Sequence, residues 1–246
     1  MAHALESIGD RPVWVVDDSA TGLAPGALPP EVQVLRSTGE EGFARACNRG
    51  LAAVQRAGLP LALLLNDDAA PQGDCIDSLL KALEEHPGAA AVGPVLLDER
   101  GQVESAGIRV HRRSARIHQL RGIPDQAQAV DALSGACLLL GSHQRLDERY
   151  RFGFEDIELC LRLRHQGRVV VLEPRARCTH QGGASLSRRS REATRHALAG
   201  HLLLVRDRPW LRPLALGWAV AQVIRERGPT ERLAGLREAW RDSRGF

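Results

Sequence analysis

Two adjacent carboxylates, Asp67 and Asp68, follow directly on an apolar run that extends from Leu59 to Leu65. The run has the length and composition of a buried strand, so both carboxylates are expected at its carboxyl end. Open α/β sheets bind their ligands in the crevice beyond such strand ends. Paired carboxylates can hold a hard divalent cation there, and that cation can hold a diphosphate. An acidic surface turn uses the same residue types, so the pair alone leaves both interpretations open.

A second acidic group, Glu155, Asp156 and Glu158, stands at the start of a predicted amphipathic helix. Carboxylates in a first helical turn interact favourably with the helix dipole, which is a purely structural explanation. The functional alternative is that one of them is a general base, because removing a proton from a hydroxyl requires an ionised acceptor within hydrogen-bond reach.

The third candidate is His180, which follows a predicted strand and precedes the glycines at 182 and 183. A single histidine in such a place is often an ordinary packed or surface residue. Glycines beside it would let the backbone approach a ligand closely. Together with Asp68, His180 would form a mixed oxygen and nitrogen ligand set, which suits Mn²⁺ as well as Mg²⁺.

Strands alternate with helices along most of the chain, which predicts an α/β fold with a mostly parallel sheet covered by helices on both faces. A region with many arginines, residues 111–128, shows no apolar period and is predicted to be a loop. The chain is predicted to be helical from Arg188 onward. The predicted strands are 12–16, 32–35, 59–65, 89–97, 130–140 and 168–172, with a short extended piece at 176–180, and the predicted helices are 43–57, 75–85 and 155–166.

Length and composition favour one large domain followed by a tail. The chain has 246 residues, 43% of them hydrophobic, and a formal net charge of +3. Its five cysteines form no CxxC pair, which is typical of a reducing compartment. No secretory signal is visible, and the apolar run at 213–224 is too short to span a bilayer. We therefore expect a cytoplasmic protein, which can still act at the inner face of a membrane.

Several short motifs in a fixed order make the chain resemble the inverting glycosyltransferases of family two. The resemblance covers residues 4–206 and is closer to the branch of bacterial rhamnosyl- and galactofuranosyl-transferase-like enzymes. It implies a GT-A fold and sugar transfer from a nucleotide-sugar donor to a hydroxyl of a glycan or lipid-linked acceptor. The motifs are residues 15–19, 42–44 with Asn48 and Gly50, 65–68, 135–136, 154–162, and Pro174 with His180, Gly182, Gly183 and Ser185.

The resemblance also implies roles for individual residues. Asp17 matches the carboxylate that contacts the nucleoside, and Asn48 and Gly135 lie in segments that match the donor site. Asp68, with Asp67 beside it, matches the carboxylates that bind the metal on the donor diphosphate.

His180 matches a metal ligand of some relatives, so the expected cofactor is Mn²⁺ or Mg²⁺. Asp156 matches the general base, with Glu155 as the reserve. The reaction would be a single displacement with inversion at the anomeric carbon.

The beginning of the chain departs from the family pattern. Residues 4–8 match the family's first helix, so the strand that normally precedes this helix is missing from the sequence. Either the true start of the protein lies upstream of Met1, or the protein has lost part of its donor site. The missing strand would form one wall of the nucleoside pocket. An alternative function is therefore a catalytically impaired GT-A-like protein that acts as a binding or assembly partner.

The expected domains are a glycosyltransferase domain at residues 1–205 and a basic amphipathic helical tail at 206–246. Around the boundary, leucines together with Trp210 and Trp218 could bind an anionic membrane, or pack on the catalytic domain or on a second subunit of a homodimer. A nucleic-acid role is disfavoured because no binding module is present. A dinucleotide-dependent oxidoreductase is disfavoured because no G-x-G-x-x-G follows the first strand.

Overall fold

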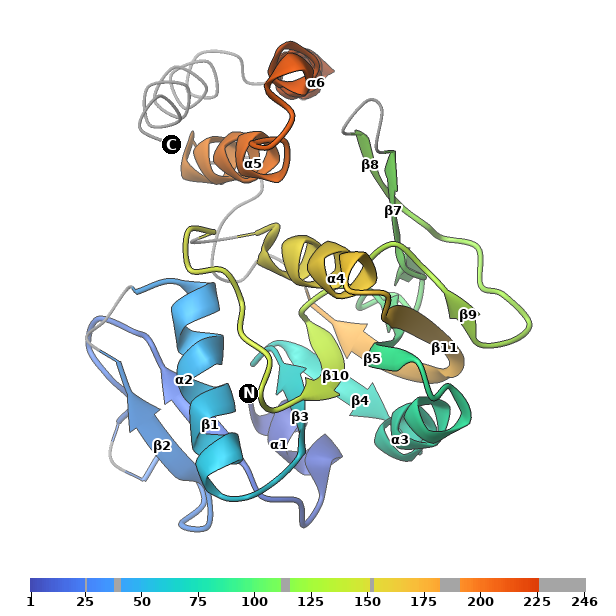
Figure 1. The fold of residues 1–246 in the computed structure, drawn as a ribbon. Helices are drawn as coiled ribbons and strands as arrows, with labels where there is room; N and C mark the ends of the chain where they lie inside the picture. Colours follow the sequence, from blue (N-terminus) through green and yellow to red (C-terminus); the bar gives the residue numbers. More distant parts are fainter. Residues whose placement is uncertain (25, 38–40, 112–115, 151–152, 182–190, 226–246) are drawn as a thin grey trace.

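A seven-stranded sheet forms the centre of the computed structural model (Figure 1), which describes all residues except 25, 38–40, 112–115, 151–152, 182–190 and 226–246. Five strands lie in the order β3, β10, β5, β11, β4, while β6 pairs with β5 and β9 pairs with β11. These strands are β3 (Leu61–Leu65), β4 (Ala69–Gln72), β5 (Ala89–Leu97), β6 (Val103–Ser105), β9 (Gln128–Ala129), β10 (Cys137–Gly141) and β11 (Val169–His180).

Two smaller sheets flank the central one. β1 (Trp14–Asp17) and β2 (Gln33–Arg36) form a parallel pair, and β7 (Ile108–His111) and β8 (Arg116–Gln119) form a hairpin. The helices are α1 (Ala2–Ile8), α2 (Phe43–Arg56), α3 (Cys75–Glu85), α4 (Glu155–His165), α5 (Arg191–Leu204) and α6 (Arg212–Arg225), with a 3₁₀ turn at Pro209–Leu211.

The predicted α/β class is confirmed, but the central sheet contains fewer parallel pairs than expected. β3, β5 and β11 share one direction, as the alternation of strands and helices indicated. β10 runs between β3 and β5 and is antiparallel to both, and β4, β6 and β9 are also antiparallel to their partners. These four strands are short and follow turns or loops, and the direction of such a strand cannot be inferred from its hydrophobicity.

Three predicted segments differ from the observed ones. The predicted loop at 111–128 contains strand β8, which pairs with β7 through His111 and Arg116. Residues 130–136 of the predicted strand 130–140 are not part of the observed strand, because only Cys137–Gly141 form β10. The two pieces predicted at 168–172 and 176–180 form the single strand β11, whose register shifts between Glu173 and Arg177. Pro174 lies at this shift and has no N–H to donate to a neighbouring strand.

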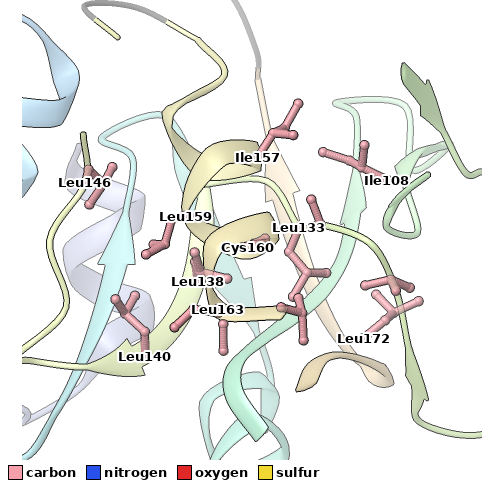
Figure 2. Packing of buried hydrophobic residues seen from close by; sticks show 14 of the residues in the cluster. Ile108, Leu133, Leu138, Leu140, Leu146, Ile157, Leu159, Cys160, Leu163 and Leu172 are labelled. Atoms are coloured by element: carbon pink, nitrogen blue, oxygen red, sulfur yellow. The ribbon is translucent and has the colours of Figure 1, made fainter. Parts of the chain in front are cut away.

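Successive residues of β10 point into two different hydrophobic clusters, as the alternation of a strand requires. Leu138 and Leu140 pack with Leu159 and Leu163 of α4 on one face of the sheet (Figure 2). Leu139 packs with Leu79 of α3 on the other face. The sheet therefore separates two helical layers, and α4 is held on one face by fully buried leucines.

Helix α2 packs against both β1 and β3 (Figure 1). β3 lies at the edge of the central sheet, and no strand within the described residues connects it to β1. The helix expected at residues 4–8 is present as α1. The absence of a central strand that the family pattern implies stays a prediction.

The tail is helical where the structure describes it. Leu202 and Leu203 of α5 are buried, so for these two leucines the structure favours packing within the protein, one of the two alternatives, over contact with a membrane. Trp210 and Leu214 are exposed by 69% and 46%. Trp218 instead packs against the β7–β8 hairpin, where the Arg116 guanidinium lies 4.4 Å from the centre of the Trp218 ring.

None of the described helices is both long enough and apolar enough to cross a membrane. The rest of the predicted tail, residues 226–246, lies outside the described residues.

Candidate active site

Strand pairing brings Asp68 and His180 together. β4 pairs with the end of β11 so that Ala69 lies opposite His180, and the N–H of Gln181 donates to the Asp68 carbonyl at 3.0 Å. Nε2 of His180 then lies 3.4 Å from Oδ1 of Asp68. Both side chains are largely buried. Two residues separated by more than 100 positions, both predicted from the sequence as metal ligands, are thus neighbours.

A third side chain, which the sequence analysis did not identify, lies beside Asp68 and His180. We call these three side chains the metal corner. Glu104 of β6 lies with Oε2 2.8 Å from Nδ1 of His180. β6 and β11 both pair with the end of β5, at Leu96 and Leu97, which brings Glu104 within reach of the imidazole. No local signal in the sequence could have found Glu104, because the contact depends on pairing across β5.

The preceding turn carries the other predicted acidic residue. Asp67 is exposed, whereas Oδ1 of its neighbour Asn66 is buried without a hydrogen-bond partner in the described structure. The N–H of Asn66 donates to the carbonyl of Ala136 at 3.0 Å. The metal role of Asp67 stays a prediction. Gly182, Gly183 and Ser185, which belong to the same family motif as His180, lie outside the described residues.

Asp68 and His180 of the metal corner fit a divalent cation that has few protein ligands. Adjacent ligands of an octahedral ion with bonds of about 2.1 Å lie about 3 Å apart, close to the 3.4 Å between His180 Nε2 and Asp68 Oδ1. Among the described residues, no group of three or more His, Cys, Asp or Glu side chains is placed so that it could hold a metal ion. Mg²⁺ and Mn²⁺ sites commonly take their remaining ligands from phosphates and water.

A strained turn introduces the acidic pair of α4. Gly153 has a φ of 83°, and Phe154, at the N-terminal end of α4, has a φ of 75°. Phe154 is the only non-glycine residue in the described chain with a positive φ. A left-handed conformation costs a residue with a side chain about 1–2 kcal/mol. The surrounding packing therefore maintains a turn that places Glu155 and Asp156 side by side at the start of the helix.

Asp156 is anchored by two backbone donors. Its Oδ2 accepts the N–H of Gly135 at 2.8 Å, and its Oδ1 accepts the N–H of Ile157 at 2.7 Å. Burial raises the pKa of Asp156, and these two hydrogen bonds oppose the increase. Gly135 thus positions Asp156, the predicted general base, through a hydrogen bond. The predicted contact of Gly135 with a donor stays a prediction.

Glu155 is buried and has a different environment. Only 5% of the residue is exposed, and its Oε2 has no hydrogen-bond partner in the described part of the chain. Burial, and then the neighbouring charge of Asp156, raise the pKa of Glu155 to about 8. At neutral pH, Glu155 is therefore mostly protonated.

Helix α5 packs directly on this turn. The ring of Phe154 lies 5.3 Å from the ring of His201, centre to centre. A Cβ added to Gly200 would come within 2.7 Å of the Phe154 ring, so only glycine fits this contact without displacement. Arg206 also forms a 3.7 Å ion pair with Asp147 in the segment before α4. Helix α5 and Arg206 thus support the acidic pair.

Asp17 and Asp18 form a hydrogen-bonded turn after β1. Asp17 accepts hydrogen bonds from the N–H and Oγ–H of Ser19, the N–H of Leu23 and the guanidinium of Arg36. The bonds from Ser19 are the main reason that the pKa of Asp17 lies well below its usual range, although burial acts in the opposite direction. Asp18 accepts the N–H of Gly42 at 2.9 Å and so anchors the start of α2. Nucleoside binding by Asp17 stays a prediction.

Asn48 of α2 binds the segment that leads to α4. Its side chain accepts the N–H of Leu146 at 2.7 Å and donates to the Leu146 carbonyl at 2.9 Å and to Glu148 at 3.1 Å. Asn48 also lines an open pocket of about 710 Å³ together with Arg45 and Arg49. Its contribution to donor binding stays a prediction.

The chain matches the family described as "Glycosyltransferase like family 2" over residues 5–199. It belongs to this family. The protein is thus a glycosyltransferase, as the sequence predicted. All eight residues predicted for the site lie within the matched range.

Curated relatives agree with the predicted branch of the family. The chain is 29% identical over 227 residues to the N-acetylglucosaminyl-diphospho-decaprenol L-rhamnosyltransferase of Mycobacterium tuberculosis, in both strain CDC 1551 / Oshkosh and strain ATCC 25618 / H37Rv. The match covers 78% of this chain and 73% of each relative.

A solved structure shows the same fold. The chain is similar to GalNAc-T7, crystallised with UDP, GalNAc and Mn²⁺, with a TM-score of 0.58 and 14% identity. The match covers 82% of this chain but only 44% of that chain, so this protein spans less than half of the solved structure. This similarity confirms the predicted GT-A fold.

Proposed function

We propose that the protein is a metal-dependent, inverting glycosyltransferase of the hexosyl- or rhamnosyl-transferase type, which transfers sugar from a nucleotide-sugar donor to a hydroxyl of a glycan or lipid-linked acceptor. One observation carries the proposal. Asp156 accepts a hydrogen bond from the N–H of Gly135. The carbonyl of the next residue, Ala136, accepts one from the N–H of Asn66. Two hydrogen bonds thus connect the acidic pair to the turn that ends in Asp68.

Asp68 and His180 are the proposed donor-side residues. Their facing oxygen and nitrogen atoms would hold Mn²⁺ or Mg²⁺, whose charge would stabilise the departing diphosphate. The buried, unpaired Oδ1 of Asn66 provides a hydrogen-bond acceptor beside them. Asp17, Asn48, Asp67 and Gly135 complete the proposed donor site.

Asp156 is the proposed general base. Each of its oxygens accepts one backbone N–H and keeps capacity for a further hydrogen bond. Asp156 takes the proton of the acceptor hydroxyl, the hydroxyl oxygen bonds to the anomeric carbon, and the bond from that carbon to the diphosphate breaks. Because the attack is opposite to the leaving group, the configuration at the anomeric carbon inverts. Glu155 is the reserve base, and it must lose its own proton before it can act, because burial and the charge of Asp156 raise its pKa to about 8.

The mycobacterial relatives support a lipid-linked acceptor. Their name describes transfer of L-rhamnose to N-acetylglucosaminyl-diphospho-decaprenol. We propose a similar acceptor class for this chain and a role in synthesis of a cell-envelope polysaccharide.

We propose that the protein works in the cytoplasm at the inner face of the cell membrane. Trp210 and Leu214 are exposed where the 3₁₀ turn meets α6. Arg208 precedes Trp210 in the sequence, and Arg212 lies between Trp210 and Leu214. An exposed apolar surface beside arginines is suited to the interface of an anionic membrane. A homodimer formed through the same surface is the alternative.

A screen of nucleotide-sugar donors with a polyprenyl-diphosphate-linked acceptor, in Mn²⁺, in Mg²⁺ and in a chelator, tests this function. We expect metal-dependent transfer and a product with inverted anomeric configuration by NMR. Transfer that persists in chelator would contradict metal dependence, and retained configuration would contradict the mechanism. Donor binding without transfer to any acceptor would instead support the alternative of a catalytically impaired assembly partner.

A further inference from the structure

Glu104 is the unexpected neighbour of the proposed metal ligand His180. Its Oε2 lies 2.8 Å from Nδ1, while Asp68 lies on the other side of the same ring, 3.4 Å from Nε2. The side chains of Glu104, His180 and Asp68 are 22%, 13% and 11% exposed, so all three are shielded from bulk water. The carboxylates contact opposite nitrogens of one imidazole instead of surrounding a common point.

The chemistry of the two contacts differs. An ionised carboxylate only accepts hydrogen bonds, so the short contact to Glu104 requires the proton to be on Nδ1 of His180. In the neutral imidazole, Nε2 then has a lone pair that faces Oδ1 of Asp68. Their separation of 3.4 Å is longer than a usual hydrogen bond between nitrogen and oxygen. Two facing acceptors at this distance are suited to share a cation.

We propose that Glu104 is a positioning residue, which fixes the Nδ1–H tautomer and the ring orientation of His180 so that Nε2 faces a divalent cation shared with Asp68. This inference rests on the proposed metal dependence. In metal sites, a carboxylate on the second nitrogen of a ligating histidine orients the ring and makes it a better ligand. β6 contributes this carboxylate. The third residue of the metal corner therefore comes from a segment that lies outside every motif that indicated the function.

Three variants test the proposal. Glu104→Leu removes the acceptor and keeps similar bulk, Glu104→Gln keeps a neutral acceptor, and Glu99→Leu is the matched control. Glu99 is exposed in the turn between β5 and β6, so its loss leaves the His180 contact intact. Thermal melting of each variant shows whether the fold is retained.

The first measurement is NMR of the ¹⁵N-labelled imidazole of His180 without metal, at a pH where the ring is neutral. We expect the Nδ1–H tautomer in the wild type and in Glu104→Gln, and a shift towards Nε2–H in Glu104→Leu. An Nε2–H tautomer in the wild type, or a tautomer that Glu104→Leu leaves unchanged, would overturn the proposal.

The second measurement is binding of Mn²⁺ alone, followed by the EPR signal of the free ion. We expect Glu104→Leu to weaken binding by about 10- to 100-fold, as loss of such an outer carboxylate typically does, with a smaller loss in Glu104→Gln and none in Glu99→Leu. In a His180→Ala background, Glu104→Leu should cause no further loss. Equal binding by wild type and Glu104→Leu would overturn the role of Glu104 alone, whereas no Mn²⁺ binding by the wild type would overturn the metal site itself.

Discussion

Gly135 donates its backbone N–H to Oδ2 of Asp156 at 2.8 Å, across 21 positions of sequence. This bond fixes the proposed base against the segment that enters β10, while α4 fixes it from the other side through Ile157. The carboxylate is therefore held in place before any substrate binds, which suits a general base, since the proton is transferred to a positioned side chain.

Glu155 is expected to make the wild type less stable as the pH rises. Its pKa is about 8 in the folded protein and near 4.5 when exposed to water. Between these values the folded state binds the additional proton, so the free energy of unfolding decreases with increasing pH. Glu155→Gln lacks this effect. Denaturant unfolding from pH 4.5 to 8 should show the variant gaining stability relative to the wild type, and a constant difference would show that Glu155 ionises normally.

Asp68→Ala is expected to abolish metal-dependent binding of the nucleotide-sugar donor and to leave the fold intact. The variant removes the oxygen that faces Nε2 of His180. Calorimetric titration of the donor with and without Mn²⁺ measures this directly. Asp67→Ala is the informative comparison, because Asp67 is exposed and its loss should have the smaller effect. Unchanged metal-dependent affinity in Asp68→Ala would remove Asp68 from the site.

Gly200→Val is expected to disturb the turn that carries the acidic pair. Even a Cβ at this position would lie 2.7 Å from the Phe154 ring, and forced overpacking costs about 1–3 kcal/mol. Thermal unfolding and turnover should both decrease. Gly217→Ala is the control, because a Cβ there would meet nothing within 4 Å. Wild-type stability and turnover in Gly200→Val would show that α5 does not support the site.

Trp210→Ala is expected to weaken binding to anionic vesicles about tenfold or more, because burying a large apolar side chain is worth about 1.5–3 kcal/mol. Binding should also weaken as salt is added. Val34→Ala is the control, since Val34 is 48% exposed on β2, remote from α6 (Figure 1). A salt-insensitive dimer without vesicle binding would favour a subunit interface at this surface instead.

Local patterns in the sequence predicted the elements that carry the site. α3 and β5 have the predicted bounds, 75–85 and 89–97, because an apolar period and a clear stop signal are encoded within each segment. The pairing partners were not predictable in this way. β10 lies between β3 and β5, and Glu104 meets His180 across 76 positions, because strands distant in sequence pair in space. The residue types alone suggested that Asp68 and His180 act together, but only the family resemblance placed Asp156 in the same proposed site.

The turnover number and the donor affinity of Asp156→Asn together provide the sharpest test of Asp156 as the general base. Asparagine keeps the shape of the side chain but cannot take the proton from the hydroxyl of the sugar acceptor. General-base catalysis typically increases the rate about 100- to 10,000-fold. We expect turnover to fall by that factor, donor affinity to change little, and Glu155→Gln to retain most of its activity. Near-normal transfer by Asp156→Asn together with loss of transfer by Glu155→Gln would contradict the assignment of the base, and full activity in both variants would place the catalytic group elsewhere.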